Sequence, residues 1–387
     1  MAEMINFDMH NEEVEAVWKA YRERKPTRVP MVFGINPRLT MFDHPSNPRG
    51  ITFEQYSSDP QLMMERQIEH QAWVRTNIVQ DAPMGLPKDG WSLWVDFQNY
   101  YEAAWYGAHI RYWPGEVPDT EPLLDDDASK WSLIEKGMPD PFTHGSAQRM
   151  WDYYGYFCRK KEEGWTYLGL PIATVAWPAG GTDGPLTLCC NLRGASKFIP
   201  DMIEDPEYAH AMLNYITETS VARIKAYRER MGAELKPERG GLADDSVMLI
   251  STPMYREIVL PYHRRMFEEL AGKGPHSIHL CGDATRHFKT IRDELNVWSF
   301  DTGYPVDFGW LRKELGPEVE IYGGPSVPFL RSGTPDAVRA EVKRILGSGI
   351  MEGGRFVLRE GNNLAPGVPM ENLRAMWDAV HEFGAYA

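Results

Sequence analysis

The sequence predicts a single α/β domain built as a (β/α)8 barrel, and three observations support this prediction. The chain has 387 residues, which is enough to bury one large core. Short apolar runs alternate with longer amphipathic segments, a pattern typical of parallel strands covered by helices. There are eight such runs, which is the strand count of a (β/α)8 barrel. Because no linker or low-complexity segment interrupts the chain, we expect one domain over residues 1–387.

The expected strands can be placed along the chain after a helical N-terminal segment. Every expected strand except the first follows a helix or a long insert. A last helix, MENLRAMWDAVHEFG, is expected at 370–384. Residues 88–165, which contain the aromatic stretch WSLWVDFQNYYEAAWYGAHIRYW, are expected to form an insertion over the barrel mouth after the second strand. The expected strands are 28–35, 75–81, 166–177, 240–246, 277–281, 296–302, 319–324 and 355–361.

Composition and charge limit the classes of function. The net charge of −14 argues against nucleic acid as a partner, because phosphates require a basic surface. No apolar run approaches the roughly 18 residues of a membrane span, and the first 25 residues are charged, so we expect neither a signal peptide nor a transmembrane helix. Four cysteines do not provide a disulfide framework in a chain of this length, which fits a cytoplasmic protein.

The carboxyl ends of the expected strands carry polar residues. In a (β/α)8 barrel these ends form the active site. Each polar residue also has an ordinary explanation, such as an aspartate that caps the next helix. Their convergence on one barrel mouth favours an enzyme. The residues at these ends, apart from two glycines, are Asn36, Arg38, Asp81, Trp177, Asp244, Asp245, His279, Cys281, Asp301, Glu360 and Asn362.

The stretch HSIHLCG at 276–282 contains the most specific signal. Residues i and i+2 of a strand point to the same side, so His279 and Cys281 are expected to project together. A histidine and a cysteine in this arrangement are either a pair of metal ligands or two core residues that happen to alternate.

Several long elements resemble the uroporphyrinogen decarboxylase superfamily over nearly the whole chain. They are RVPMVFGINPR (28–38), GPLTLCCNLRG (184–194) and IYGGPSVPFLRSGTPDAVRAEVKRIL (321–346). Within the superfamily, HLCG (279–282) and FVLREGNNLAPGVPMENLRAM (356–376) resemble the corrinoid-dependent methyltransferase branch. The resemblance implies a (β/α)8 fold and methyl transfer between a small substrate and the cobalt of a separate corrinoid protein.

The resemblance also implies a zinc ion held by His279, Cys281 and a later cysteine. This chain has Asn362 where that cysteine would stand. Glu360 shares the expected inward parity of Asn362, so we expect it as the third ligand, and Asp244, Asp245 or Asp301 as other candidates. A carboxylate would make the zinc a harder Lewis acid, suited to polarising an ether oxygen. The alternative is that no metal binds and His279 acts as an acid or hydrogen-bond donor.

We therefore expect transfer of a methyl group from a small methylated substrate, with a methoxylated aromatic as the first guess and a quaternary amine as the competing one. His279 and either Asp81 or Asp244 would be catalytic. Aromatic walls would come from Trp91, Trp94, Trp105 and Trp177. The residues expected to bind substrate are Asn36, Arg38, Trp94, Trp177, Asp245, Asp301 and Asn362.

Two alternatives remain open. A porphyrinogen decarboxylase would need several arginines at the mouth, and only Arg38 and Arg193 can be placed there, although Asp81 lies where the key aspartate of that family would be. A non-catalytic barrel that binds a ligand or a corrinoid protein is the second alternative, supported by the missing third cysteine.

Overall fold

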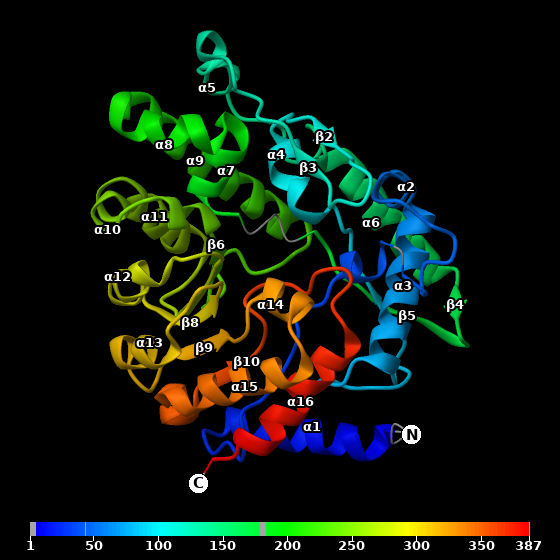
Figure 1. Ribbon diagram of the computed structural model, residues 1–387. Coiled ribbons are helices and arrows are strands. Elements are labelled where there is room, and N and C mark those ends of the chain that lie inside the picture. Colours follow the sequence, from blue (N-terminus) through cyan, green and yellow to red (C-terminus); the bar gives the residue numbers. More distant parts are fainter. Residues whose placement is uncertain (1–4, 43, 179–182, 387) are drawn as a thin grey trace.

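The computed structural model describes residues 5–42, 44–178 and 183–386. It is a mixed α/β fold in which helices surround parallel strands (Figure 1). The strands are β1 (Trp91–Leu93), β2 (Ile110–Arg111), β3 (Asp119–Thr120), β4 (Thr166–Tyr167), β5 (Leu170–Val175), β6 (Gly241–Ala243), β7 (His276–Leu280), β8 (Val297–Thr302), β9 (Glu320–Gly323) and β10 (Phe356–Leu358).

The α-helices vary in length from single turns to the 25 residues of α9. A π-helical turn, Tyr255–Val259, joins α10 to α11. The helices are α1 (Phe7–Arg22), α2 (Phe53–Ser58), α3 (Pro60–Asn77), α4 (Tyr101–Trp105), α5 (Ser132–Lys136), α6 (Ala147–Glu162), α7 (Pro185–Arg193), α8 (Ala195–Glu204), α9 (Pro206–Arg230), α10 (Thr252–Met254), α11 (Leu260–Leu270), α12 (Thr285–Leu295), α13 (Phe308–Leu315), α14 (Val327–Ser332), α15 (Pro335–Ile345) and α16 (Met370–Phe383). Among the described residues, no helix is long and apolar enough to cross a bilayer.

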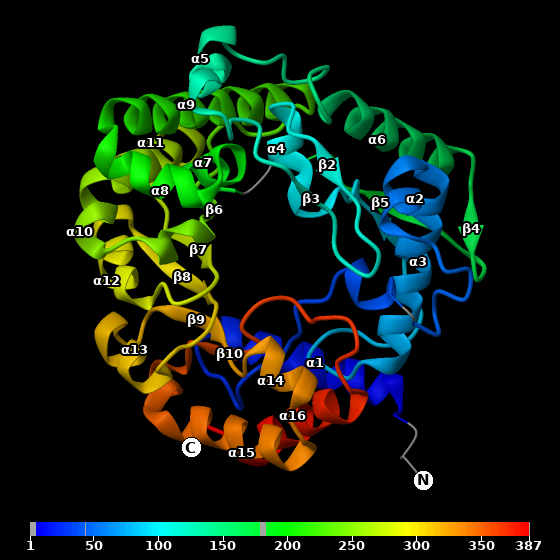
Figure 2. The same cartoon turned by 45° about the horizontal axis from the view of Figure 1, so that its top comes forward.

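The central sheet contains five parallel strands in the order β10-β9-β8-β7-β6. Its register pairs His279 of β7 with Asp301 of β8 and with Ala243 of β6. Figure 2 shows the five strands along the inner side of a ring, with α12 and α13 outside them. Burial alternates along β7, where His276, Ile278 and Leu280 are buried and Ser277 and His279 are more exposed. This alternation places Ser277 and His279 on one side of the sheet and the buried residues on the other.

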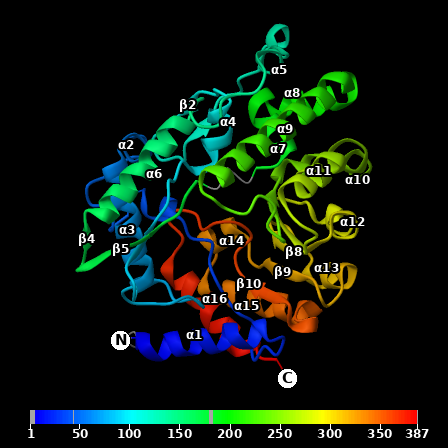
Figure 3. The ribbon, with the colours of Figure 1, turned by 180° about the vertical axis from the view of Figure 1, so that it is seen from behind.

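Single bridges extend the central sheet at both edges. Met31 pairs with Leu358 of β10, and Asp183 pairs with Ala243 of β6, both in parallel orientation. On the other side of the ring, β5 pairs in parallel with β1 and antiparallel with β4. Figure 3 shows α3 and α6 near β5, away from the five-stranded sheet. Closure of these pieces into one eight-stranded barrel stays a prediction.

The strands predicted from the sequence agree with the structure in the second half of the chain and agree poorly in the first half. All five strands expected after residue 240 are present, although each is shorter than or shifted from its expected range. The prediction of a strand at 75–81 was wrong, because α3 continues to Asn77 and residues 78–81 form no named strand, with bends at 80 and 81. Residues 28–35 make only isolated bridges, and 166–177 form the β4–β5 hairpin.

Local capping explains where several of these helices begin. Asp59 accepts hydrogen bonds from the backbone N–H groups of Gln61 and Leu62, and Pro60 occupies the first position of α3. Asn6 caps α1 in the same way. Both caps satisfy N–H groups that have no partner within the helix.

The segment expected as an insertion, 88–165, contains β1, β2, β3, α4, α5 and α6. Its first strand, β1, belongs to the same sheet as β5, so the part of the sequence expected to lie over the barrel also contributes a strand. Many of its aromatic side chains form a second apolar cluster around Trp91, Tyr100, Phe157 and Ile172. The sequence predicts that Trp91 and Trp105 form aromatic walls of the site. Both are instead almost fully buried and pack in the core.

Candidate functional site

Four of the expected site residues come together at the carboxyl ends of three adjacent strands. His279 is near the end of β7, Cys281 follows that strand, Asp301 is near the end of β8 and Asp245 follows β6. Because β6, β7 and β8 are hydrogen-bonded neighbours, their ends are held a few ångströms apart by the sheet itself. The grouping therefore follows from backbone register and does not depend on a flexible loop.

The imidazole of His279 lies between a carboxylate and a thiol. Its Nδ1 lies 2.8 Å from Asp301 Oδ2, and its Nε2 lies 3.0 Å from Cys281 Sγ and 3.8 Å from Asp245 Oδ1. A carboxylate can only accept a hydrogen bond, so this contact assigns the proton to Nδ1. The lone pair of Nε2 then faces the sulfur of Cys281 and the carboxylate of Asp245.

Asp245, His279 and Cys281 form a group whose ligand atoms all lie within 4.8 Å of one another. The set offers one nitrogen, one sulfur and one oxygen, which are the atom types that bind zinc in proteins. Three protein ligands are the usual number in catalytic zinc sites, where a fourth position is left for water or substrate. On the chemistry of the donor set, these residues fit a zinc ion.

A residue that the sequence reasoning missed, Arg359, lies behind the group. Its guanidinium donates to Asp301 Oδ2 at 2.8 Å and to the backbone oxygen of Asn362 at 2.8 Å. Asp301 Oδ2 thus accepts from both Arg359 and His279. The other oxygen, Asp301 Oδ1, is buried without a hydrogen-bond partner in the described structure, so it has spare accepting capacity.

The surroundings of His279 and Cys281 shift the pKa of each side chain. Burial lowers the pKa of His279, but the hydrogen bond and charge of Asp301, together with the charge of Asp245, outweigh it and raise the pKa overall. Burial raises the pKa of the Cys281 thiol, and Asp245 raises it further. A bound cation would oppose this effect, because a positive charge at the sulfur favours the thiolate.

Glu360 lies outside this group, although we had expected it as the third metal ligand. Its Oε1 accepts a hydrogen bond of 2.7 Å from the Gly34 N–H, and its Oε2 is buried without a partner in the described structure. The approach requires glycine, because a Cβ at position 34 would lie 2.6 Å from Glu360 Oε1. Burial raises the pKa of Glu360 to about 8, so it is mostly protonated at neutral pH and poorly suited to bind a metal.

Asp81 and Asp244, the two aspartates expected to be catalytic, are saturated by other contacts. Both oxygens of Asp81 accept from the Arg28 guanidinium at 2.7 Å, and Oδ2 also accepts from the Met31 N–H. Asp244 is fully buried and accepts from the N-terminal backbone of α7, from the Thr187 hydroxyl and from His263 Nε2. These contacts indicate structural roles for both.

Arg38, expected to bind substrate, has amide partners rather than a carboxylate partner. Its guanidinium donates to the side-chain oxygens of Gln98 and Asn99. Burial lowers the pKa of Arg38, and the charge of Asp96, together with that of Cys281 when it is a thiolate, acts in the opposite direction. Arg193, by contrast, pairs with Asp201 and Asp127.

The remaining expected residues lie around the strand ends. Asn36 caps the short 3-10 helix Pro37–Thr40. Asn362 lines a cavity of about 410 Å³ together with Tyr304 and Arg331. Trp94 and Trp177 are partly buried, and Trp177 packs against the second apolar cluster.

Comparison with known proteins identifies the family. The family model for uroporphyrinogen decarboxylase (URO-D) matches residues 176–383, which is more than half of the chain. The protein belongs to the URO-D family. The match includes the candidate site, because β6, β7, β8 and Arg359 all lie within it.

The proteins that this chain resembles include methyltransferases. The chain is 31% identical over 202 residues to a methylated-thiol–coenzyme M methyltransferase of Methanosarcina mazei, covering 51% of each protein. It is 27% identical over 212 residues to the methylcobamide:CoM methyltransferase MtaA of Methanosarcina barkeri, covering 53% of this chain and 58% of that protein. The chain thus spans about half the length of the curated relatives it matches.

A solved structure extends the likeness of fold. A methyltransferase from Methanosarcina mazei superposes with a TM-score of 0.62 over 96% of this chain and 98% of that one, at 19% identity. At this identity the likeness concerns the fold, and the arrangement of helices around parallel strands is shared along nearly the whole chain.

Proposed function

We propose that this protein is a methyltransferase that moves a methyl group from a small methylated substrate to the cobalt of a corrinoid carried by a partner protein. The observation that supports this function best is the Asp245–His279–Cys281 group at the carboxyl ends of the central strands. Active sites of (β/α)8 enzymes lie at this end. The bridges of Met31 and Asp183 at the sheet edges support the further proposal that the strands close into such a barrel.

Asp245, rather than Glu360, is the proposed third ligand of a zinc ion with His279 and Cys281. Zinc, when bound, would act as a Lewis acid on the substrate atom whose bond to the methyl group breaks. Asp301 holds the Nδ1 proton of His279 and keeps Nε2 directed at the ligand group. Arg359 in turn fixes Asp301. The Asp245 carboxylate also holds the Cys281 backbone at 2.7 Å, which positions the thiol.

The substrate is proposed to carry an anionic group that binds Arg38. The Arg38 guanidinium is partly buried, and its hydrogen-bond partners are the side-chain oxygens of Gln98 and Asn99, while the charge of Asp96 acts on it without a direct ion pair. Donors of the guanidinium are therefore left for an anionic group of the substrate. A carboxylate on the substrate would accept hydrogen bonds from this guanidinium. Methoxylated aromatic acids fit this requirement, with Trp94 and Trp177 as candidates for a ring wall. Methylated thiols that carry an acid group fit it too, and the 31% identical relative favours them as the second candidate.

Decarboxylation of a porphyrinogen is less well supported. Such a substrate carries several carboxylates and requires several free arginines. Arg193 is committed to Asp201 and Asp127, and both oxygens of Asp81 are committed to Arg28. Neither residue is therefore free for the role that this alternative gives it.

The proposal is tested by loading the purified protein with zinc and mixing it with a cobalt(I) corrinoid and one donor at a time. The donors are methoxybenzoates, S-methylated mercapto acids and methylamines, and the visible spectrum reports methylation of cobalt. We expect turnover with an acidic donor, loss of turnover in His279→Ala and normal turnover in His210→Ala, whose histidine is exposed on α9. Failure of every donor, together with carbon dioxide release from a porphyrinogen, would favour the decarboxylase.

A further inference from the structure

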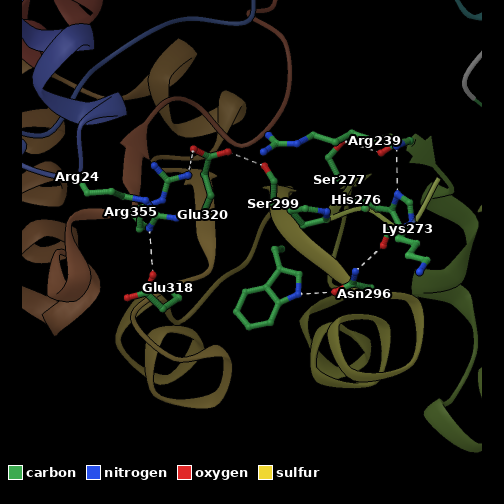
Figure 4. Close-up of a pocket in the computed structure, with 14 residues that line it drawn as sticks. Arg24, Arg239, Lys273, His276, Ser277, Asn296, Ser299, Glu318, Glu320 and Arg355 are labelled. Atoms are coloured by element: carbon green, nitrogen blue, oxygen red, sulfur yellow. Dashed lines mark hydrogen bonds and ion pairs between the residues drawn. The ribbon is translucent and has the colours of Figure 1, made fainter. Parts of the chain in front are cut away.

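A second cavity, of about 740 Å³, lies at the opposite ends of the same strands (Figure 4). Its walls come from the amino ends of β7, β8 and β9 and from the residues just before β6 and β10. His276, at the start of β7, lines this cavity, whereas His279 belongs to the group at the other end of the strand. Its volume is in the range of pockets that bind drug-sized ligands.

The cavity carries an excess of positive charge. Arg24 pairs with Glu318 at 3.2 Å and Arg355 pairs with Glu320 at 2.7 Å, so these four residues compensate one another. Arg239 and Lys273 also line the cavity, and within residues 5–42, 44–178 and 183–386 neither forms an ion pair. Figure 4 shows the side chain of Arg239 extending towards Ser299. Two cations that form no ion pair within the described residues therefore line one cavity, in a chain of net charge −14.

An exposed indole completes the cavity wall. Trp298 on β8 is 39% exposed, and its Nε1 donates to the side-chain oxygen of Asn296 at 2.7 Å. Trp298 lines the cavity, and this hydrogen bond restrains the orientation of its indole. A fixed aromatic ring next to cations suits a ligand that has both a planar ring and a negative charge.

We propose that this cavity binds a small organic phosphate with a planar ring, of the nucleoside monophosphate class. A phosphate monoester carries a charge of about −1.5 to −2 at neutral pH, which matches the two free cations. Arg239 and Lys273 bind the phosphate, and Trp298 stacks on the ring. This site is separate from the proposed methyl-transfer centre and does not depend on that proposal.

Adenosine 5′-monophosphate is the probe, with adenosine and inorganic phosphate as partial probes, and calorimetry of the full chain measures the binding. We expect adenosine 5′-monophosphate to bind more tightly than either partial probe, and the double variant Arg239→Ala/Lys273→Ala to weaken it at least tenfold. Trp298→Ala should weaken the nucleotide about threefold and leave inorganic phosphate unchanged. The matched control Lys289→Ala/Lys313→Ala removes two exposed cations from α12 and α13 and should bind as the parent does.

Three results would overturn the proposal: no binding of the nucleotide, equal weakening in both double variants, or equal affinity for adenosine and its monophosphate. All five substituted residues are on the surface or half-exposed, and unchanged thermal melting shows that each variant is folded. No methyl donor is present in these titrations, so their outcome is independent of the methyltransferase assay.

Discussion

Asp244 and Asp245 are adjacent carboxylates after the same strand, β6, and their surroundings are opposite. Asp244 is fully buried, and its oxygens accept hydrogen bonds from His263, from the Leu186 and Thr187 backbone and from the Thr187 hydroxyl. The side chain of Asp245 is 45% exposed, and its hydrogen-bond donors come from Cys281, whose N–H lies 2.7 Å from Oδ1. A carboxylate at a strand end can therefore bind a metal or a substrate only where its oxygens are not all used by hydrogen bonds. Where neighbouring groups use them all, the carboxylate has a structural role.

The largest effect is expected at the unsaturated group. His279→Ala removes the nitrogen ligand that faces Cys281 and Asp245, so zinc content should fall from about one equivalent to near zero. Methyl transfer should decrease at least a thousandfold, about 4 kcal/mol in activation free energy. Elemental analysis and the cobalt spectrum measure the two quantities, and His210→Ala is the control. Full zinc content in the variant would remove the metal assignment.

The comparison of the two aspartates predicts a smaller effect, on stability. Asp244→Ala leaves His263 and the first turn of α7 without their partner in the core, so we expect unfolding free energy to fall by about 3 kcal/mol. Asp245→Ala should cost less than about 1 kcal/mol, because its side chain is nearly half exposed, but it should lose zinc. Urea unfolding of the metal-free proteins measures both. Equal losses of stability would show that burial does not separate the two residues.

A third prediction concerns Glu360, a buried acid with one hydrogen bond. Its folded pKa of about 8 lies above the ordinary value of 4.5, so the folded state holds the proton more tightly than the unfolded state. Its contribution to stability is fully present below pH 4.5 and is lost as the pH rises through 8. Between pH 6 and pH 8 we expect the free energy of unfolding to fall by about 2 kcal/mol from this group.

Glu360→Gln removes this dependence, because an amide does not titrate in that range. The difference in unfolding free energy between the parent and the variant should therefore change with pH across this window. A constant difference from pH 6 to pH 8 would show that Glu360 is ionised in the folded protein, and would restore it as a candidate ligand.

The sequence predicted the second half of the fold better than the first. The strands after residue 240 alternate regularly with amphipathic helices, and all are present. The prediction for 75–81 was wrong because RTNIVQD contains β-branched residues after a helix, whereas α3 continues to Asn77 and Asp81 is bound to Arg28. The three residues of β1 are too short to be recognised inside an aromatic segment.

The candidate site shows a similar division. Strand periodicity in the sequence predicts that His279 and Cys281 lie on the same side. It does not predict how deeply each acidic side chain is buried, and burial is what distinguishes Asp245 from Asp244 and Glu360. Arg359 was missed because alternation was extended through 355–361, whereas β10 ends at Leu358 and the following residues turn. Beyond that point, parity no longer tells which side chains face the strand ends.

The smallest expected effect tests whether Asp301 and Arg359 position His279. Asp301→Asn keeps the size of the side chain but removes the charge that holds the Nδ1 proton, so zinc affinity should fall 10- to 100-fold, in the range found for second partners of metal-binding histidines. Arg359→Gln acts through Asp301 and should lower affinity less than tenfold. Chelator competition measures affinity directly, without substrate or corrinoid.

Arg374→Gln, which removes an exposed arginine paired with Asp378 on α16, is the matched control and should bind zinc normally. If Arg359→Gln weakens zinc more than Asp301→Asn does, the order of contacts is wrong, because the guanidinium reaches the imidazole only through the carboxylate.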